Sequence, residues 1–325
     1  MHDIVTIGSA TRDAFLVSKA FKTIDPDPEK PGAFECIPLG EKIDLDACTL
    51  STGGGASNAA VTFARLKLKT AIVARVGKDD FGDEIARDLK KEYVDIKFLK
   101  RDATEPTAFS VLLTAPDGER SALVSRGASA HWSEKDIPFD KLKSSWLYIT
   151  SLGGDLSLAL KAIRYGVSHG MKTAYNPGIA ELKKGMESFE PVLRNLTIFN
   201  LNLEEAQLLL TTDTRDIVKL CRGIAQKDLL IILTDGPRGA YAYRNDELWF
   251  VRPEAVKVIS STGAGDAFGS GFAAAFMKEY SIEDCLRVAM INSQEVIQHF
   301  GAKHGIIHAF PGKKRMQEIK VRKLR

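Results

Sequence analysis

The second half of the chain alternates short apolar runs with amphipathic segments. Four apolar runs have the length and aliphatic composition of buried strands, at 146–150, 172–175, 197–200 and 229–233. Between these strands, apolar residues recur at helical spacing over 156–168, 203–210 and 214–226. Strands that alternate with helices in this way predict a mostly parallel sheet with helices on both faces. The expected fold class is therefore α/β.

The first half of the chain adds a second pattern. A strand, a helix, a strand and a helix are expected at 4–7, 56–66, 71–76 and 81–91. Shorter β-prone segments lie on either side of this unit, at 34–38, 43–52, 107–115 and 121–125. The last two flank Pro-Asp-Gly-Glu, a hairpin signal, at 116–119. We therefore expect a small β-sheet attached to the larger body and built from approximately residues 13–51 and 98–127.

Beyond residue 233 the pattern predicts a hairpin and two closing helices. The hairpin would pair 240–244 with 247–251, and the helices are expected over 264–279 and 282–299. No internal repeat or low-complexity segment interrupts the chain. A single α/β domain over residues 1–325 is the expected organisation.

The composition is that of a soluble globular protein. The 325 residues are 44% hydrophobic and 27% charged. No run of about 18 apolar residues occurs, and the N-terminus has no signal-peptide pattern, so no membrane association is expected. The four cysteines are far apart without metal-ligand spacing, which predicts neither a zinc site nor a disulfide framework. These features predict a cytoplasmic protein.

Positive charge is concentrated at the C-terminus. Residues 313–325 contain seven Lys or Arg and one Glu, whereas the formal charge of the whole chain is only +3. The remainder of the chain is therefore net negative. A basic tail can contact nucleic acid, but a solvated terminus is the more common use of such a segment. We expect residues 312–325 to form a solvated basic tail and expect no nucleic-acid partner.

The strongest chemical signal is the segment Gly263-Ala264-Gly265-Asp266, directly before an apolar helix. Its small residues let backbone N–H groups approach a ligand closely, and a helix N-terminus favours a phosphate. A carboxylate that only capped the helix would repel that phosphate. Asp266 is better explained as a base that accepts a proton from an attacking hydroxyl. The plain alternative is a glycine turn in which Asp266 favours the helix start electrostatically.

Two further turns have the composition of ligand-binding segments. Gly54 and Gly55 lie in a strand-to-helix turn where the backbone can approach a polyhydroxylated ligand. Asn58 offers both a donor and an acceptor, although helix capping explains the same residue. The third segment, at 76–83, is equally well explained as a turn before a helix.

In this order and spacing, these segments resemble the PfkB/ribokinase family of carbohydrate and nucleoside kinases. GGGASNAA at 53–60 and VGKDDFGDEI at 76–85 are similar to the N-terminal signature of that family, and STGAGDAFGSGF at 261–272 to its C-terminal signature. The segment from Asn202 to Glu205 resembles the N-x-x-E motif of the family, and TDGPRG at 234–239 resembles its T-x-G-x-x-G nucleotide loop. Asp13 matches the usual substrate-binding Asp. The resemblance covers nearly the whole chain.

The resemblance implies a ribokinase-like three-layer fold with a small β-sheet lid. It implies an ATP-dependent kinase that phosphorylates an alcohol group of a sugar, with Asp266 as the base. The N–H groups that would form its anion hole are those of Gly263, Ala264 and Gly265. Substrate would be held by Asp13, Gly54, Gly55 and Asn58. ATP would be held by Asn202, Glu205, Thr234, Gly236, Gly239 and Asn292.

The resemblance also implies Mg²⁺, on which Glu205 would act indirectly, through water and phosphate. Ser260 stands where the family usually has an Asp that helps to bind K⁺, so dependence on K⁺ stays open. Gly55 stands where ribokinases proper have Lys, and Thr11 where they have Asn, so ribose is not assumed as the substrate. Family members often form dimers through the lid, which makes a homodimer a candidate assembly.

Other functions remain as alternatives to a sugar kinase. A nucleoside kinase of the adenosine type would retain the same base and anion hole. A catalytically weak sugar- or nucleotide-binding protein is an alternative of another class, motivated by Ser260, although the intact segment 263–266 argues against it. No G-x-G-x-x-G follows the first strand, which disfavours an NAD-dependent oxidoreductase, and the absence of G-x-x-x-x-G-K-[ST] excludes a P-loop kinase.

Overall fold

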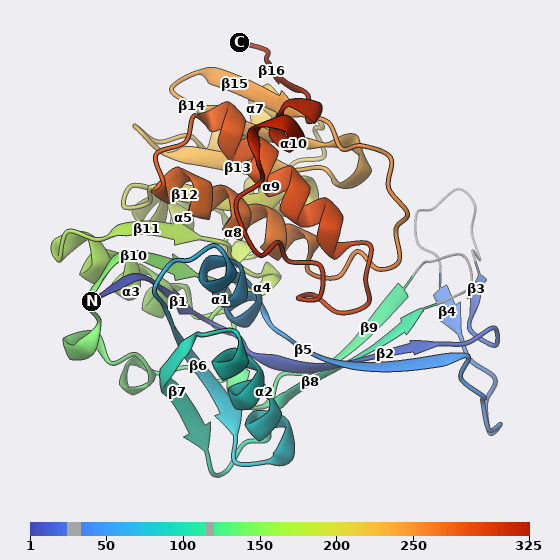
Figure 1. Ribbon diagram of the computed structural model, residues 1–325. Coiled ribbons are helices and arrows are strands. Elements are labelled where there is room, and N and C mark those ends of the chain that lie inside the picture. Colours follow the sequence, from blue (N-terminus) through green and yellow to red (C-terminus); the bar gives the residue numbers. More distant parts are fainter. Residues whose placement is uncertain (25–33, 115–119) are drawn as a thin grey trace.

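A computed structural model describes residues 1–24, 34–114 and 120–325. Its middle layer is a ten-stranded sheet (Figure 1). Seven neighbouring strands are parallel, and in spatial order they are β13 (Leu230–Thr234), β12 (Ile198–Asn202), β11 (Lys172–Tyr175), β10 (Ser144–Ile149), β1 (His2–Ile7), β6 (Thr70–Gly77) and β7 (Asp95–Asp102). Three antiparallel strands extend the edge beyond β13, namely β14 (Ala240–Arg244), β15 (Glu247–Val251) and β16 (Val321–Lys323).

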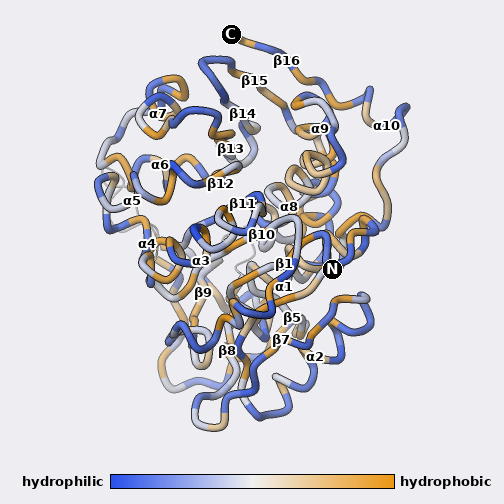
Figure 2. The backbone as a smooth tube through the Cα atoms, turned by 90° about the vertical axis from the view of Figure 1, so that its left-hand side faces the viewer, coloured by the Kyte–Doolittle hydropathy of each residue, from blue (hydrophilic) through white to orange (hydrophobic). Residues whose placement is uncertain are grey.

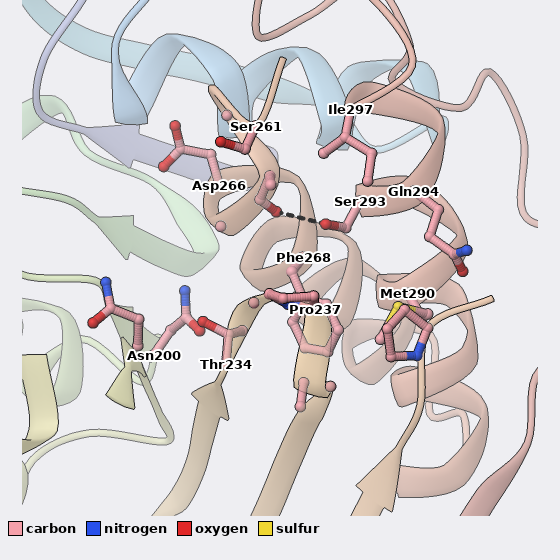
Figure 3. Close-up of a pocket in the computed structure, with 18 of the residues that line it drawn as sticks. Asn200, Thr234, Pro237, Ser261, Asp266, Phe268, Met290, Ser293, Gln294 and Ile297 are labelled. Carbon is pink, nitrogen blue, oxygen red and sulfur yellow. Dashed lines mark hydrogen bonds between the residues drawn. The ribbon is translucent and has the colours of Figure 1, made fainter. Parts of the chain in front are cut away.

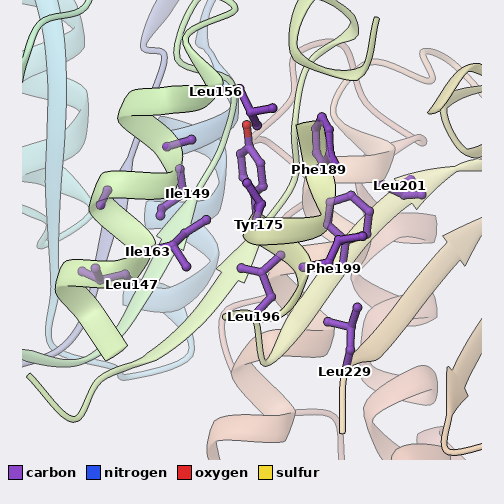
Figure 4. Packing of buried hydrophobic residues seen from close by; sticks show 14 of the residues in the cluster. Leu147, Ile149, Leu156, Ile163, Tyr175, Phe189, Leu196, Phe199, Leu201 and Leu229 are labelled. Carbon is purple, nitrogen blue, oxygen red and sulfur yellow. The ribbon is translucent and has the colours of Figure 1, made fainter. Parts of the chain in front are cut away.

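One face of the sheet is covered by a helical layer formed by α3 (Leu156–Ser168), α4 (Ile179–Leu182), α5 (Gly185–Leu193), α6 (Leu203–Leu210) and α7 (Ile217–Ile224). Figure 4 shows this core, where Phe189 of α5 lies beside Tyr175 and Phe199 of the sheet. The ring centroids are 6.3 Å apart for Tyr175 and Phe189 and 5.9 Å apart for Phe189 and Phe199. Burial of these large side chains is the main force that holds the layer on the sheet.

The opposite face is covered by α1 (Gly55–Arg65), α8 (Ala264–Met277) and α9 (Ile282–Val296). The amphipathic helix α2 (Asp80–Lys91) buries Ile85 and Leu89 beside β6 and β7. Figure 2 views the layers from the side, with hydrophobic and hydrophilic residues interspersed along the surrounding helices. The resulting three layers confirm the predicted α/β fold class. No helix in the described ranges is long and apolar enough to cross a membrane.

A separate four-stranded sheet projects from this body (Figure 1). Its strands, in spatial order, are β5 (Ala47–Gly53), β2 (Thr11–Val17), β8 (Ala108–Thr114) and β9 (Arg120–Ser125). β3 (Lys22–Ile24) and β4 (Phe34–Cys36) pair as a further two-stranded sheet. We call the four-stranded sheet the small sheet. It brings the end of β5, which leads into α1, beside β2 and its residue Asp13.

The bounds predicted for the small sheet differ from the structure at one place. Residues 98–102 belong to β7, which pairs with β6 at the edge of the central sheet, and not to the small sheet. Five of the eight residues of β7 are charged, which made this strand resemble exposed structure. The predicted turn at 116–119 lies outside the described residues, and the flanking strands β8 and β9 pair antiparallel.

The C-terminal segment is packed, so the prediction of a solvated tail is wrong. Helix α10 (Lys313–Glu318) lies against α9. Its residue Met316 is buried, and so is Ile319, which follows the helix. β16 then pairs with β15 as the last strand of the central sheet. The basic side chains of this segment remain largely exposed. The positive charge of this segment therefore lies on the outer surface of an ordered edge of the central sheet, and not on a free tail.

Three-residue 3₁₀ helices complete the described elements. They are Gly127–Ser129, Glu134–Asp136, Phe139–Lys141 and Gly236–Arg238. The last of these follows β13 and takes part in the candidate site.

Candidate active site

A cavity of about 670 Å³ lies at the carboxyl ends of β12 and β13 and against the N-terminus of α8 (Figure 3). Open α/β sheets bind ligands at this edge because strand ends and helix starts meet there. Most of the residues predicted to bind ATP or handle phosphate line this cavity. They are Asn202, Glu205, Thr234, Gly236, Gly239, Gly263, Ala264, Gly265 and Asp266.

Helix α8 begins at a glycine that no other residue would replace without strain. Gly263 has φ +82°, and a Cβ at this position would lie 2.5 Å from the Cβ of Ala302. The N–H of Ala264 donates to the carbonyl of Ser261 at 3.3 Å. Among the described residues, the N–H groups of Gly265 and Asp266 have no hydrogen-bond partner. These groups and the positive end of the helix dipole can bind an anion in the cavity.

The carboxylate of Asp266 is held by a residue in the first turn of α1, the helix that follows β5. Its Oδ2 accepts a hydrogen bond from Nδ2 of Asn58 at 2.8 Å. Removal from solvent raises the pKa of Asp266, and the negative charge of Asp13 raises it further, whereas the hydrogen bond from Asn58 opposes this rise. A carboxylate with a raised pKa is a stronger base, which suits proton abstraction.

Asp13 lies on β2 with its carboxylate against the glycine turn of β5. Its Oδ1 accepts from Oγ1 of Thr11 at 3.1 Å, and a Cβ on Gly53 would lie 2.0 Å from its Oδ2. Burial raises the pKa of Asp13, while hydrogen bonds from Ser110 and Thr11 and the positive charge of Lys303 counteract it. The carboxylate is therefore buried at a position that is already supplied with donors.

The four predicted substrate-binding residues form a corner beyond Asp266 and do not line the 670 Å³ cavity itself. Gly54 has φ +94°, and a Cβ there would lie 2.6 Å from the carbonyl oxygen of Ser9. A Cβ on Gly55 would lie 3.2 Å from Thr150. Oδ1 of Asn58 is buried and has no partner among the described residues. We call Asp13, Gly54, Gly55 and Asn58 the substrate corner.

Asn202 and Glu205 cap the start of α6 reciprocally. Oδ1 of Asn202 accepts from the N–H of Glu205, and Oε2 of Glu205 accepts from the N–H of Asn202, both at 2.8 Å. Burial raises the pKa of Glu205, and the charge of Asp266 contributes to the same shift. Asn202 and Glu205 therefore cap α6 and line the cavity at the same time.

No group of three or more His, Cys, Asp or Glu in the described residues could hold a metal ion. A divalent cation at this site would need oxygen ligands from phosphate and water. This donor set fits Mg²⁺, which retains several waters and binds phosphate oxygens.

The other end of the cavity is formed by the turn after β13 and by α9. Gly236 has φ +51° and Gly239 has φ +119°, and a Cβ on Gly239 would lie 2.5 Å from the carbonyl oxygen of Val251. Figure 3 shows Pro237 and Met290 away from Asp266 on this side. Together with Ile297, they give the cavity an apolar end that can accommodate a flat ring.

The structure places Asn292 elsewhere than predicted. Its side chain is fully buried, with Nδ2 donating to the carbonyl of Ala267 at 2.8 Å and Oδ1 accepting from the N–H of Ile307 at 3.0 Å. Asn292 therefore ties α9 to α8 and to the following segment, and it does not line the cavity. The prediction was wrong because position 292 lies on the α9 face that packs against α8.

Several lining residues were not predicted. On α9 they recur at the spacing i, i+3, i+4 and i+7, as Met290, Ser293, Gln294 and Ile297. Ser293 also fixes the start of α8 by donating to the carbonyl of Ala264 at 3.0 Å (Figure 3). Asn176 and Asn200 line the cavity at the ends of β11 and β12. Polar residues at the ends of apolar strands were the signal that would have identified them.

Two curated proteins resemble this chain over most of its length. It is 28% identical over 245 residues to a protein from Archaeoglobus fulgidus called an uncharacterized sugar kinase, covering 75% of this chain and 97% of that protein. It is 24% identical over 273 residues to the ribokinase of Haemophilus influenzae, covering 82% of this chain and 88% of that protein.

Solved structures share the fold. The ribokinase of Giardia lamblia superimposes with a TM-score of 0.78 at 21% identity, covering 98% of this chain and 99% of that chain. The Arabidopsis thaliana ribokinase complexed with ribose and ATP gives a TM-score of 0.75 at 22% identity, with 98% of each chain covered. The profile of pfkB family carbohydrate kinases matches residues 1–309. The chain therefore belongs to the pfkB family of carbohydrate kinases and has the ribokinase fold.

Proposed function

We propose that this kinase transfers the γ-phosphoryl group of ATP to a hydroxyl group of a sugar, with Asp266 as the general base. One observation carries the proposal: Asp266 and the N–H groups of Gly265 and Asp266, which have no partner in the described chain, lie between two binding regions. On one side is the 670 Å³ cavity, and on the other is the substrate corner. The curated relatives include ribokinases, deoxyribokinases and probable fructokinases, which supports a sugar as the acceptor.

The phosphoryl transfer itself needs positioning and charge stabilisation more than covalent chemistry. Asp266 accepts the proton of the acceptor hydroxyl as the oxygen attacks. The N–H groups of Gly265 and Asp266 would donate hydrogen bonds to the phosphoryl oxygens as negative charge develops on them. Gly263 forms the turn that orients these N–H groups. Ala264, which was predicted to donate its N–H to the anion, is left out of the proposed anion hole, because that N–H already donates to the carbonyl of Ser261.

The substrate corner orients the sugar. The Asp13 carboxylate accepts hydrogen bonds from two hydroxyls, and the free Oδ1 of Asn58 accepts another. Gly54 and Gly55 let the sugar approach the backbone closely. Because Nδ2 of Asn58 is bonded to Asp266, the residue that binds the sugar also orients the base. Asn58 thus couples substrate positioning to catalysis.

The nucleotide is held at the opposite end. Thr234, Gly236 and Gly239 form the turn beside the phosphates and ribose, and Met290 and Ile297 bound the base. Asn202 and Glu205 would hold the water ligands of Mg²⁺, which when bound would neutralise part of the phosphate charge. A K⁺ requirement is not part of the proposal, because Ser260 offers a hydroxyl in place of a carboxylate.

The small sheet would act as a lid that closes over the sugar and excludes water. The lid can also provide the surface of a homodimer. Hydrogen exchange tests the closure: saturating sugar is expected to protect β2, β5 and β8 more than β14 and β15, which lie far from the substrate corner. Equal exchange with and without sugar in the small sheet would exclude a closing lid.

The test of the function is ADP release from Mg·ATP across a panel of sugars, sugar phosphates and nucleosides, each with and without K⁺. Turnover with at least one free sugar, absent in the Asp266→Asn variant, is the expected result. If only nucleosides were phosphorylated, the acceptor would be a nucleoside and the proposal of a sugar substrate would be wrong. No turnover with any compound, despite measurable ATP binding, would refute the kinase proposal and favour a binding protein.

A further inference from the structure

A second cavity of about 330 Å³ lies between α2, β5 and the segment after α9. Its lining is strongly charged. Three acidic side chains, Glu84, Asp88 and Glu92, face it. Five basic side chains face it as well, namely Arg12, Arg65, Arg87, Lys91 and Lys303. Counting only Lys, Arg, Asp and Glu, the lining has an excess of two positive charges.

Three of the basic residues are paired with the three acids. Lys303 is buried and donates from Nζ to Oδ2 of Asp88 at 2.9 Å. Arg65 forms a two-point contact with Glu92, at 2.8 and 2.7 Å. NH2 of Arg12 lies 2.9 Å from Oε2 of Glu84. These contacts neutralise the acids, so the excess charge resides on the remaining two basic residues.

The side chains of Arg87 and Lys91 have no hydrogen-bond or ion-pair partner among the described residues. They are four residues apart on α2 and thus lie on one face, where like charges repel. Arg12 is 9% exposed, yet its Nε is buried without a hydrogen-bond partner in the described chain. This Nε is shielded from the cavity, so a ligand there would bind Arg12 through the terminal nitrogens of its guanidinium group, one of which already contacts Glu84.

We propose that this cavity is a regulatory site for a small ligand that bears a phosphate group. A phosphomonoester carries a charge of roughly −1.5 to −2 near neutral pH, which matches the excess charge of the lining. Arginine and lysine side chains are the usual partners of phosphate. The cavity volume is at the lower limit of small-molecule sites, large enough for a short organic group beside the phosphate.

The site is connected to the substrate corner through two strands. Arg12 on β2 pairs in register with Thr52 on β5. The next residues along these strands are Asp13 and Gly53, which contact each other on the substrate side. A phosphate that holds Arg12 therefore acts on the strands that carry Asp13, and it is expected to change KM for the sugar more than KM for ATP. This functional consequence rests on the proposed function, but binding itself does not.

Isothermal titration calorimetry with glycerol 3-phosphate and, separately, inorganic phosphate tests the site. A non-hydrolysable ATP analogue is kept at saturation so that the anion-binding start of α8 is occupied. The test variant is Arg87→Gln/Lys91→Gln, in which both residues are exposed and outside the proposed catalytic machinery. The matched control is Lys69→Gln/Lys90→Gln, which removes the same charge from exposed residues that do not line the cavity.

The expected result is binding to the wild type and the control, weakened about tenfold or more in the test variant because two charge-assisted contacts are lost. Tighter binding of glycerol 3-phosphate than of phosphate identifies an organic phosphate as the ligand, and equal binding identifies the free ion. No binding by the wild type, or equal binding by all three proteins, would overturn the proposal. Because calorimetry needs no turnover, this failure is distinct from a failure of the kinase assignment.

Discussion

The ammonium group of Lys303 joins the small sheet to the main body, and its removal is the most informative test of how the substrate corner is held. Nζ of Lys303 donates to Oγ1 of Thr52 on β5 at 2.8 Å and to Oδ2 of Asp88 on α2 at 2.9 Å. Its side chain is only 6% exposed. Lys303→Met keeps most of the side-chain length but leaves Asp88 without its ion-pair partner.

The size of the effect follows from the burial of the pair. Breaking a fully buried ion pair costs about 3–5 kcal/mol. The side chain of Asp88 is 35% exposed, so water compensates part of the loss, and we expect about 3 kcal/mol. An unfolding entropy of about 2.1 cal/mol/K per residue gives roughly 0.7 kcal/mol/K for a chain of this length. The melting temperature should therefore fall by about 4 °C.

Calorimetric melting of three variants tests this reasoning. Lys303→Met/Asp88→Leu leaves no unpaired charge and is expected to recover most of the stability lost by the single variant. Lys19→Met is the control, because Lys19 is 88% exposed and lies 3.9 Å from Asp46, where an ion pair contributes about 1 kcal/mol at most. A melting temperature of Lys303→Met equal to that of the control would refute the argument, as would a double variant no more stable than the single one.

Two further predictions concern the pH dependence and the helix start. Since the pKa of Asp266 is raised by removal from solvent and by Asp13, kcat/KM should be lost as pH falls through a value above the ordinary aspartate range. In pH–rate profiles, Asn58→Ala should move this acid limb to higher pH and Asp13→Asn to lower pH; shifts of the same sign would contradict the assigned causes. Gly263→Ala should cost about 2–4 kcal/mol in denaturant unfolding, because it forces a Cβ against Ala302 at φ +82°, and an unchanged midpoint would disprove the steric argument.

Much of the central sheet could be predicted because its signals are local. The hairpin β14–β15 has the predicted bounds, and α3 and α6 begin and end where the apolar spacing indicated. The strand β7 was not predicted, because its sequence DIKFLKRD reads as exposed while its backbone completes the sheet edge. β16 was not predicted for a similar reason: its pairing with β15 is a long-range contact that a local count of charges does not reveal.

The glycine turns of the candidate site were easier to predict than its full lining. Glycines at 263 and 54 are required by backbone conformation, so their spacing is visible in the sequence. Asn292 illustrates the limit, since an amide in the correct helix can equally serve packing, and only the orientation of α9 decides between its faces. The contact of Asn58 with Asp266, 208 residues apart in the chain, likewise depends on how α1 and α8 pack.

The most direct test of the central claim is the steady-state turnover of Asp266→Asn with the sugar that the panel identifies. Asparagine keeps the shape of the side chain but cannot accept the proton of the hydroxyl. Glu204→Gln is the matched control, since Glu204 lines the same cavity and has no part in the proposed chemistry. The account predicts that Asp266→Asn has the melting temperature and the ATP affinity of the wild type. Its turnover should be slower by a factor of about 10² or more, while the turnover of the control is nearly normal. Turnover of Asp266→Asn within a few-fold of the control would contradict the assignment of the base.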